Sequence, residues 1–532
     1  MKTLVGTSRL IRFVLRRERL RLSIWLAVLI ALPVGTAAAF IDLYPAAAER
    51  ERLAGTVASN PAMIAFLGPI NGSSIGALTT WRIGTLAALL AGLMVVLAVI
   101  RHTREEEETG RRELLGATVV GRHAPLVAAM LVSGSAGLFL GLLVTVGLVG
   151  QGLPVGGALA YGVGLFGVSV AMTAVAGLIA QLTEGATSAR GISIALLGVA
   201  FLLRMLGDSG ESRGIGWLSW TSPIGWFGRL RPFAGERWSV VALWVGLAML
   251  AAAAAFAVSA RRDVGAGAFP TRFGRPVAAP NLSGPLGLAW RLHRSSLLGW
   301  SVGLGMAGVV FGSVANSLTE ILGDNPQLAA IYERLGSESG ITDVYFSFGT
   351  GIMAMVASAF AIRTALRLRV EEESLRAEPI LATATPRLSW AGSHLVFAVL
   401  GPAAMLAMGG AAAGAIYGAV IDDGQQVWRV IGTALNQLPA VWVILGLAVA
   451  LFGVAPRLVA VSWGLLVVSL LVGQLGEILQ FPQWVLDVSP FTHIPSLLTA
   501  DGSVVPLYVL TVIAVALFAI GLRGFRHRDV GT

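Results

Sequence analysis

The chain has 532 residues, of which 55% are hydrophobic and only 13% are charged, with a formal net charge of +9. Soluble domains carry about 25% charged residues, so the composition excludes a soluble protein and predicts one that crosses a membrane many times. The absence of cysteine excludes disulfides, thiolate metal sites and cysteine nucleophiles. Lys2 is the only lysine, so the chain lacks the Gly-Lys-Ser/Thr loop with which P-loop proteins bind ATP.

Twelve apolar stretches approach the length of about 17–25 residues that a membrane-spanning helix needs. They predict an all-α polytopic membrane protein with spans at residues 22–41, 83–100, 124–149, 158–182, 191–206, 240–259, 296–314, 345–362, 393–420, 430–454, 458–476 and 504–522. The fifth stretch is the weakest, because only thirteen uncharged residues separate Arg190 from Arg204. It predicts either a full span or a re-entrant half-helix.

The basic residues predict the orientation of these spans. With the N-terminus in the cytoplasm of a bacterial cell, 28 of the 38 Lys and Arg residues fall on the inner side of the plasma membrane. Twelve spans then place both termini in the cytoplasm. The stretch 10–22 mixes Leu, Ile and Phe with five arginines, which predicts an amphipathic helix on the inner leaflet.

The sequence contains an internal repeat. A shift of 265 residues places 104–108 on 369–373, and a shift of 267 places Ser222-Pro223 on Ser489-Pro490. Each half has six spans, so the two halves have the same orientation and form a parallel repeat. The predicted parts are a first half, 1–259, a Pro-rich cytoplasmic linker, 260–295, and a second half, 296–532.

The loop after the second span of each half carries a run of charged residues. Glu107 and Arg111, and Glu108 and Arg112, are spaced by four, and Glu372 and Arg376 repeat this spacing, which favours a helix. One interpretation is a solvated connection between spans; the other, favoured by its occurrence in both halves, is a docking helix for a cytoplasmic partner. The candidate docking residues are Arg104, Glu105, Glu106, Glu107, Glu108, Arg111, Arg112, Glu113, Glu371, Glu372, Glu373, Arg376 and Glu378.

The spans lack the groups that ion-coupled transport uses. None of the 29 acidic residues lies in the middle of a predicted span, and the six histidines lie in loops or at span ends. Because proton and ion pathways are marked by intramembrane carboxylates, this pattern indicates that energy comes from outside the chain. No grouping of residues predicts a catalytic centre or a metal site.

Two predicted outer loops, 207–239 and 477–503, contain apolar stretches rich in Trp and Pro, which predict re-entrant or interfacial helices that cap the outer end. One interpretation is an outer gate, and the other is anchoring of the chain at the membrane interface by tryptophan. The candidate gate residues are Ser222, Pro223, Trp226, Ser489 and Pro490.

The run 104–115, the stretch 117–122, Ser222-Pro223-Ile224-Gly225-Trp226 and the six-plus-six layout together resemble ABC-2-type transporter permeases. More narrowly, they are similar to actinobacterial exporters of polyketide antibiotics, the tetronasin-type permeases. The resemblance covers essentially the whole chain. The second half departs from the pattern, with Val370 in the acidic run and Thr492-His493 in place of Gly225-Trp226.

The resemblance implies a permease that exports hydrophobic or amphiphilic compounds and is not itself an enzyme. Such permeases pair with a separate cytoplasmic ATPase, here expected in two copies, which binds ATP and Mg²⁺; the chain itself holds no cofactor or metal and binds no nucleic acid. Residues 102–122 and 367–387 correspond to the coupling helices that receive the ATPase motion.

Two other functions remain open at this stage. A secondary drug transporter of the major facilitator kind shares the six-plus-six parallel repeat. A membrane enzyme or assembly scaffold is the third, although the sequence offers no catalytic constellation for it.

Overall fold

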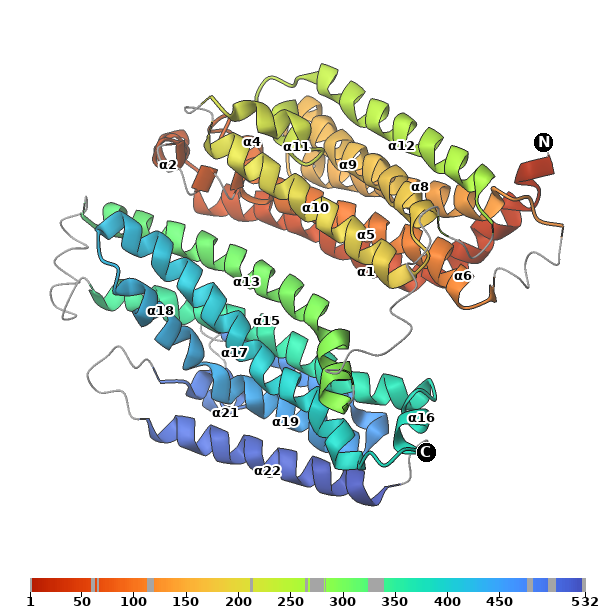
Figure 1. The fold of residues 1–532 in the computed structure, drawn as a ribbon. Helices are drawn as coiled ribbons and strands as arrows, with labels where there is room; N and C mark the ends of the chain where they lie inside the picture. The colour runs from red at the N-terminus through yellow and green to blue at the C-terminus, as the bar shows by residue number, and fades with distance from the viewer. Residues whose placement is uncertain are drawn as a thin grey trace. The chain divides into compact units, whose positions relative to one another are not determined.

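The chain divides into two helical units, Met1–Gly274 and Arg275–Thr532, in a computed structural model (Figure 1). The structure describes residues 2–58, 63–64, 67–111, 119–210, 214–263, 267, 282, 284–323, 339–475, 482–495 and 504–528. The division falls within the segment 260–295.

The first unit is built from long helices joined by short helical turns. Its helices are α1 (Thr7–Leu43), α2 (Ala47–Ala58), α4 (Ile75–Thr79), α5 (Thr85–Ile100), α6 (Glu106–Glu108), α8 (Ala124–Gly150), α9 (Val155–Leu182), α10 (Ala186–Ser209), α11 (Gly225–Leu230) and α12 (Val241–Arg261). Two π-helical turns, Thr80–Gly84 and Arg101–Glu105, join α4, α5 and α6 into one continuous helix.

The second unit repeats this plan. Its helices are α13 (Pro285–Gly323), α15 (Ser339–Glu373), α16 (Ala377–Leu381), α17 (Arg387–Ile421), α18 (Gln426–Leu435), α19 (Leu438–Val454), α20 (Ala460–Leu475), α21 (Gln483–Leu486) and α22 (Val505–His527). The described residues of both units contain no β-strand, which confirms the all-α prediction.

Eleven helices in the described part of the chain are long and apolar enough to cross a membrane. The prediction of a polytopic membrane protein is therefore confirmed. The fifth predicted span is α10, whose 24 residues suffice for a full crossing. The predicted span 458–476 is the exception, because α20 has 16 residues and its predicted last residue lies outside the described residues.

The N-terminal stretch differs from the prediction. Residues 10–22 do not form a separate surface helix, because α1 runs without a break from Thr7 to Leu43. Leu10, Val14, Glu18 and Leu22 recur every four residues and are buried, so this face packs inward. The helix thus extends the first span beyond its apolar part.

Corresponding helices have corresponding neighbours in the two units. In the first unit α8 packs on α1 and α9, and α9 also packs on α5 and α12. In the second unit α17 packs on α13 and α18, while α19 packs on α15 and α22. The last long helix therefore lies beside the fourth span in each unit: α12 beside α9 in the first, and α22 beside α19 in the second (Figure 1).

Close helix contact is made possible by small residues, as at Gly453 of α19 and Gly521 of α22. A Cβ atom at Gly453 would lie 1.9 Å from the carbonyl oxygen of Gly521. Glycine is thus the residue that lets these two backbones meet.

Candidate functional site

Acidic and basic side chains gather at one end of each unit. We name this end the charged end and define it by residues 101–111 in the first unit and 367–378 in the second. In the first unit the helix widens into the π-helical turn Arg101–Glu105, continues as α6, and ends at Glu108, two residues before Gly110. Gly110 has a φ of 70° and donates its N–H to the carbonyl oxygen of Glu107 at 3.1 Å. π-Helical turns are frequent at functional sites.

Glu107 is the most enclosed carboxylate of this run, with a side chain only 2% exposed. It lies 2.5 Å from Arg104, whose side chain is fully buried, and 2.7 Å from Arg262. Arg262 also donates from Nε to Oε1 of Gln181 at 2.7 Å. Burial lowers the pKa of Arg262 from its usual value. The paired carboxylate offsets the cost of burying these charges.

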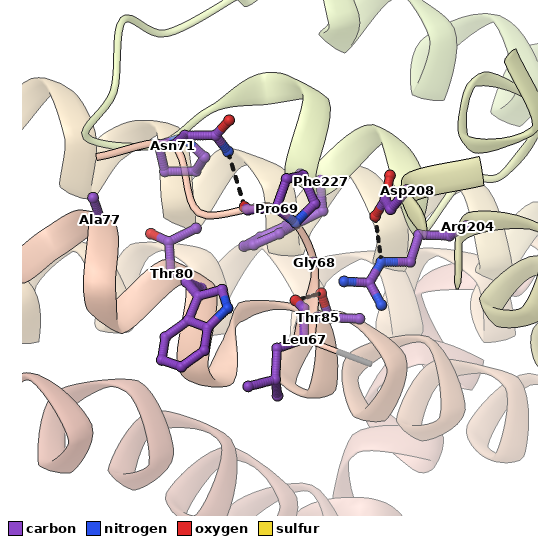
Figure 2. Close-up of a pocket in the computed structure, with 13 residues that line it drawn as sticks. Leu67, Gly68, Pro69, Asn71, Ala77, Thr80, Thr85, Arg204, Asp208 and Phe227 are labelled. Carbon is purple, nitrogen blue, oxygen red and sulfur yellow. Dashed lines mark hydrogen bonds and ion pairs between the residues drawn. The ribbon is translucent and has the colours of Figure 1, made fainter. Parts of the chain in front are cut away.

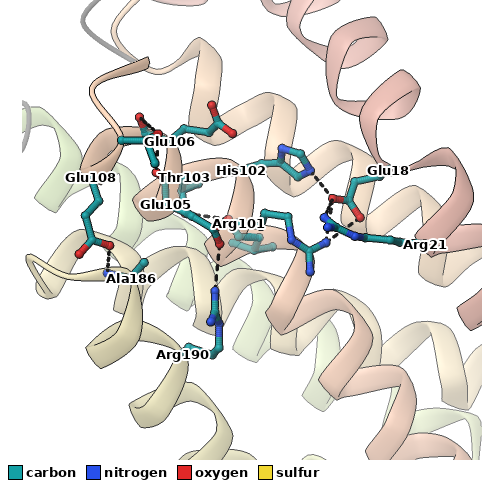
Figure 3. A network of polar contacts seen from close by, with 12 residues as sticks. Glu18, Arg21, Arg101, His102, Thr103, Glu105, Glu106, Glu108, Ala186 and Arg190 are labelled. Carbon is teal, nitrogen blue, oxygen red and sulfur yellow. Dashed lines mark hydrogen bonds and ion pairs between the residues drawn. The ribbon is translucent and has the colours of Figure 1, made fainter. Parts of the chain in front are cut away.

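The neighbouring acidic residues bind other helices of the first unit, as Figure 3 shows. Glu105 pairs with Arg190 of α10 at 2.9 Å. Glu108 accepts a hydrogen bond from the N–H of Ala186, the first residue of α10, at 3.1 Å. A carboxylate at this position satisfies a helix N-terminus and complements its dipole.

A second group of contacts joins the charged end to α1. Glu106 pairs with Arg17, and Glu18 accepts hydrogen bonds from Arg101 at 2.8 Å through both of its oxygens. His102 lies 3.0 Å from the same carboxylate (Figure 3). The acidic run therefore ties α1 and α10 to the end of the second span, and its buried members are not a solvated charge run.

Among the described residues, the charged end of the second unit makes fewer contacts than that of the first. Glu372 pairs with Arg528 at 2.6 Å, and the guanidinium of Arg528 lies 4.6 Å from the centre of the Phe452 ring. Glu371 and Glu373 pair with arginines one helical turn earlier on α15, at 3.1 and 2.6 Å. Most of these pairs lie within one helix, unlike those of the first unit.

The predicted pairing of glutamate with the arginine four residues later is wrong for Glu107 with Arg111 and for Glu372 with Arg376. The helices end too early, at Glu108 and Glu373, and a left-handed turn follows at Gly110 and at Leu375. Arg111 lies 3.6 Å from Glu106, and Arg376 lies 4.0 Å from Glu371. The predicted residues Arg112 and Glu113, and the first copy's apolar stretch to residue 118, lie outside the described residues.

The predicted docking residues thus separate into inward-facing and outward-facing groups. Arg104, Glu106 and Glu107 are enclosed by other helices, and Glu371 and Glu372 are buried in the second unit. The exposed charges are those of Glu108, Arg111, Glu373, Arg376 and Glu378. In the second unit, α16 follows the turn and places Ile380 and Leu381 against the core.

The predicted gate residues of the first unit lie between the C-terminal end of α10 and the N-terminal end of α12. The buried Ser222 hydroxyl donates to the carbonyl oxygen of Ala200 at 2.6 Å. Trp244 donates from its indole to the carbonyl oxygen of Pro223 at 2.9 Å, and the ring of Trp226 packs on that of Trp244. These contacts fix the segment to both helices.

The corresponding segment of the second unit is built differently. Ser489 is fully buried, but its hydroxyl has no hydrogen-bond partner among the described residues. Pro490 begins a 3₁₀ turn that ends at His493, and His493 lies 3.0 Å from the carbonyl oxygen of Asp487. The outer gate and the interfacial anchor both stay predictions for these two segments.

A small cleft lies beside the outer segment of the first unit (Figure 2). Its wall contains Arg204 of α10, which is 3% exposed and pairs with Asp208 at 2.8 Å. Ser219 donates a hydrogen bond to the same carboxylate at 2.6 Å. The cleft is therefore lined by a satisfied ion pair, and the guanidinium of Arg204 stays inside the unit.

Comparison with known proteins gives one relative that matches almost the whole chain. The multidrug efflux system permease protein Rv1217c of Mycobacterium tuberculosis is 42% identical over 528 residues, covering 99% of this chain and 95% of the relative. The chain belongs to this family of multidrug efflux permeases. The family model for the C-terminal domain of Rv1217c also matches residues 282–526.

Two residues of this efflux permease that sequence reasoning missed are Arg262 and Arg528, the partners of Glu107 and Glu372. They are 155 and 156 residues from their partners, so no local spacing reveals the pairs. The sequence did contain a signal for these two arginines, because a shift of 266 residues, close to that of the internal repeat, places Arg262 on Arg528. Among the described residues of the permease, no group of three His, Asp or Glu side chains is arranged to hold a metal ion.

Proposed function

We propose that the chain is the membrane-spanning permease of an ATP-driven exporter that moves hydrophobic or amphiphilic compounds, such as drugs and polyketide antibiotics, out of the cell. The observation that carries the proposal is the 42% identity to a multidrug efflux system permease over nearly the whole chain. The energy would come from a separate cytoplasmic ABC ATPase, since the chain has no Gly-Lys-Ser/Thr loop of its own.

The charged ends are proposed to face the cytoplasm. The bias of 28 of 38 basic residues toward that side supports this orientation, with both termini inside a bacterial plasma membrane. Two units with matching charged ends suit two copies of the ATPase. The finer assignment to the ABC-2 type, and to the tetronasin-type exporters, rests on the sequence resemblance.

The outward-facing charges are proposed as the docking surface. Arg111 and Arg376 have side chains 53% and 63% exposed, and Glu108 and Glu378 are exposed close to them. The inward-facing carboxylates would instead hold the coupling segments to the helices that must move. The coupling region of each unit would thus have an exposed face that binds the partner and a buried face that is attached to other helices of the unit.

The test is purification of the tagged chain from its native membranes in mild detergent, followed by mass spectrometry of the bound proteins. A P-loop ATPase at about two copies per chain is expected. The purified complex in proteoliposomes should move a hydrophobic dye when ATP is added, and the movement should persist with a protonophore. Transport that needs a proton gradient and no ATP would instead establish a secondary transporter.

The docking surface is tested with a variant that neutralises Arg111, Arg376 and Glu378 together and leaves Glu108 in place, because Glu108 also binds the N-terminus of α10. It should fold normally and lose the ATPase. The matched control neutralises Glu51 of α2, which is exposed and lies in the connection at the opposite end of the first unit. An ATPase retained equally by both variants would refute the docking surface without affecting the transport function.

A further inference from the structure

The last long helix of each unit ends in the same way. Arg262 is the residue directly after α12, and Arg528 is the residue directly after α22. Both leave the helix in an extended conformation, with φ and ψ of −94° and 151° for Arg262 and −79° and 156° for Arg528. This matched geometry turns both side chains toward the acidic run of their own unit.

Each arginine binds the carboxylate at the end of the second span. Arg262 donates from its two terminal nitrogens to the two oxygens of Glu107, at 2.7 and 3.0 Å. Arg528 donates to Glu372 at 2.6 Å. The planar fork of arginine suits this recognition of a carboxylate, and a charge-assisted bond of this kind is stronger than a neutral one.

A second arginine completes the arrangement in each unit. Arg122, just before α8, donates to the carbonyl oxygen of Arg262. Arg387, the first residue of α17, donates to the carbonyl oxygen of Arg528 at 3.0 Å. Arg122 and Arg387 are themselves related by the shift of 265 residues. We name the three residues of each unit its terminal clamp: Glu107, Arg262 and Arg122 in the first, and Glu372, Arg528 and Arg387 in the second.

The clamps resist opening because their charges are enclosed. The side chains of Arg262 and Glu107 are 5% and 2% exposed, and those of Arg528 and Glu372 are 14% and 5% exposed. Separating such a pair moves an enclosed arginine away from its carboxylate where little water can replace it, so the closed pair is preferred. Each clamp joins both ends of the proposed coupling segment, 102–122 or 367–387, to the last helix.

We propose that the terminal clamps make α12 and α22 move together with the coupling segments, so that Arg262 and Arg528 transmit the ATPase motion to the last helix of each unit. This inference rests on the proposed ATP-driven function. The second and third spans of each unit continue directly from the coupling segment. The last span is connected to it by the clamp, and the clamp stays closed through the transport cycle.

The first experiment measures transported molecules per ATP hydrolysed, using the reconstituted complex with its ATPase. The variants R262Q and R528Q should keep the ATPase bound and hydrolysing, while the transport ratio falls roughly threefold to thirtyfold, the range expected when a residue carries coupling between sites. R262K should lie between R262Q and the unchanged chain, because lysine keeps the charge without the fork.

The matched control is R190Q. It breaks the pair between Arg190 and Glu105 of the same acidic run at a similar distance, 2.9 Å, but both side chains are about 40% exposed. It should leave the transport ratio unchanged. A normal ratio in both R262Q and R528Q would overturn the inference, as would an equal loss in R190Q.

A covalent tether supplies an independent test, because the chain contains no cysteine. The double variant E107C/R262C should transport poorly, and a short bifunctional thiol reagent that joins the two positions should restore the transport ratio. If joining them abolishes the remaining transport, the clamp must open during the cycle and the inference is wrong. This comparison also separates a coupling defect from poor folding, since misfolded protein gains nothing from the tether.

Measurements on the unchanged chain distinguish a failure of the proposed function from a failure of the clamp inference alone. If it binds no ATPase or moves the dye without ATP, the proposed function fails and the clamp inference fails with it. If it moves the dye with ATP while the variants behave normally, the exporter stands and only the clamp inference fails.

Discussion

Replacing Glu107 with glutamine tests whether the inward-facing carboxylate is structural. Glutamine keeps the shape of the side chain but removes the charge that lies between Arg104 and Arg262, which are 0% and 5% exposed. Removing one partner of a buried ion pair costs about 3–5 kcal/mol. For a domain of about 250 residues, 1 kcal/mol shifts the melting temperature by roughly 2–4 °C, so E107Q should lower it by at least about 6 °C.

The comparison is E373Q, which breaks the pair between Glu373 and Arg369 on α15. Those side chains are 61% and 29% exposed, and exposed helical pairs contribute about 0.3–0.5 kcal/mol, so the shift should stay below about 2 °C. The assay is loss of helical circular dichroism on heating in detergent micelles. Equal melting temperatures for E107Q and E373Q would refute the assignment of Glu107 to a buried network.

Further variants test the packing that positions these sites, each by the same melting assay. G453A should cost about 1–3 kcal/mol, because its Cβ would meet the backbone of Gly521, whereas G464A meets nothing within 4 Å and should be neutral. S222A should lose about 1–3 kcal/mol, since it leaves the buried N–H of Gly225 without the hydroxyl that accepts from it. D208N should lose about 3–5 kcal/mol through the arginine that it leaves unpaired, and a wild-type melting curve would contradict that pairing.

Hydropathy predicted the existence of the spans well and their ends poorly. The apolar core of α1 begins near residue 22, but the helix begins at Thr7, because arginine is a good helix former and the buried face continues through Leu10 and Val14. A window that measures hydrophobicity cannot detect a helix that extends past its apolar part. For α20 the opposite holds, since an apolar stretch of full length forms a helix of 16 residues in the described part.

The repeat located the charged ends correctly but not the partners of their side chains. Spacing arguments consider residues three or four apart, but Glu107 and Glu372 bind arginines that are 155 and 156 residues away in the sequence. These ion pairs depend on tertiary packing, which places α12 against α9 in the first unit and α22 against α19 in the second. The two copies also differ in how fully the carboxylate is hydrogen-bonded. Both oxygens of Glu107 accept from Arg262, whereas Oε1 of Glu372 has no hydrogen-bond partner among the described residues.

The left-handed turns at the two charged ends occupy equivalent positions with different residues. Glycine adopts this conformation freely at Gly110, whereas Leu375, with a φ of 57°, does so at a steric cost. Its backbone is held by two hydrogen bonds of 2.9 Å, from Leu375 to Glu372 and from Arg376 to Glu371. Hydrogen bonding thus holds the same left-handed turn in both units although the residue at the turn differs.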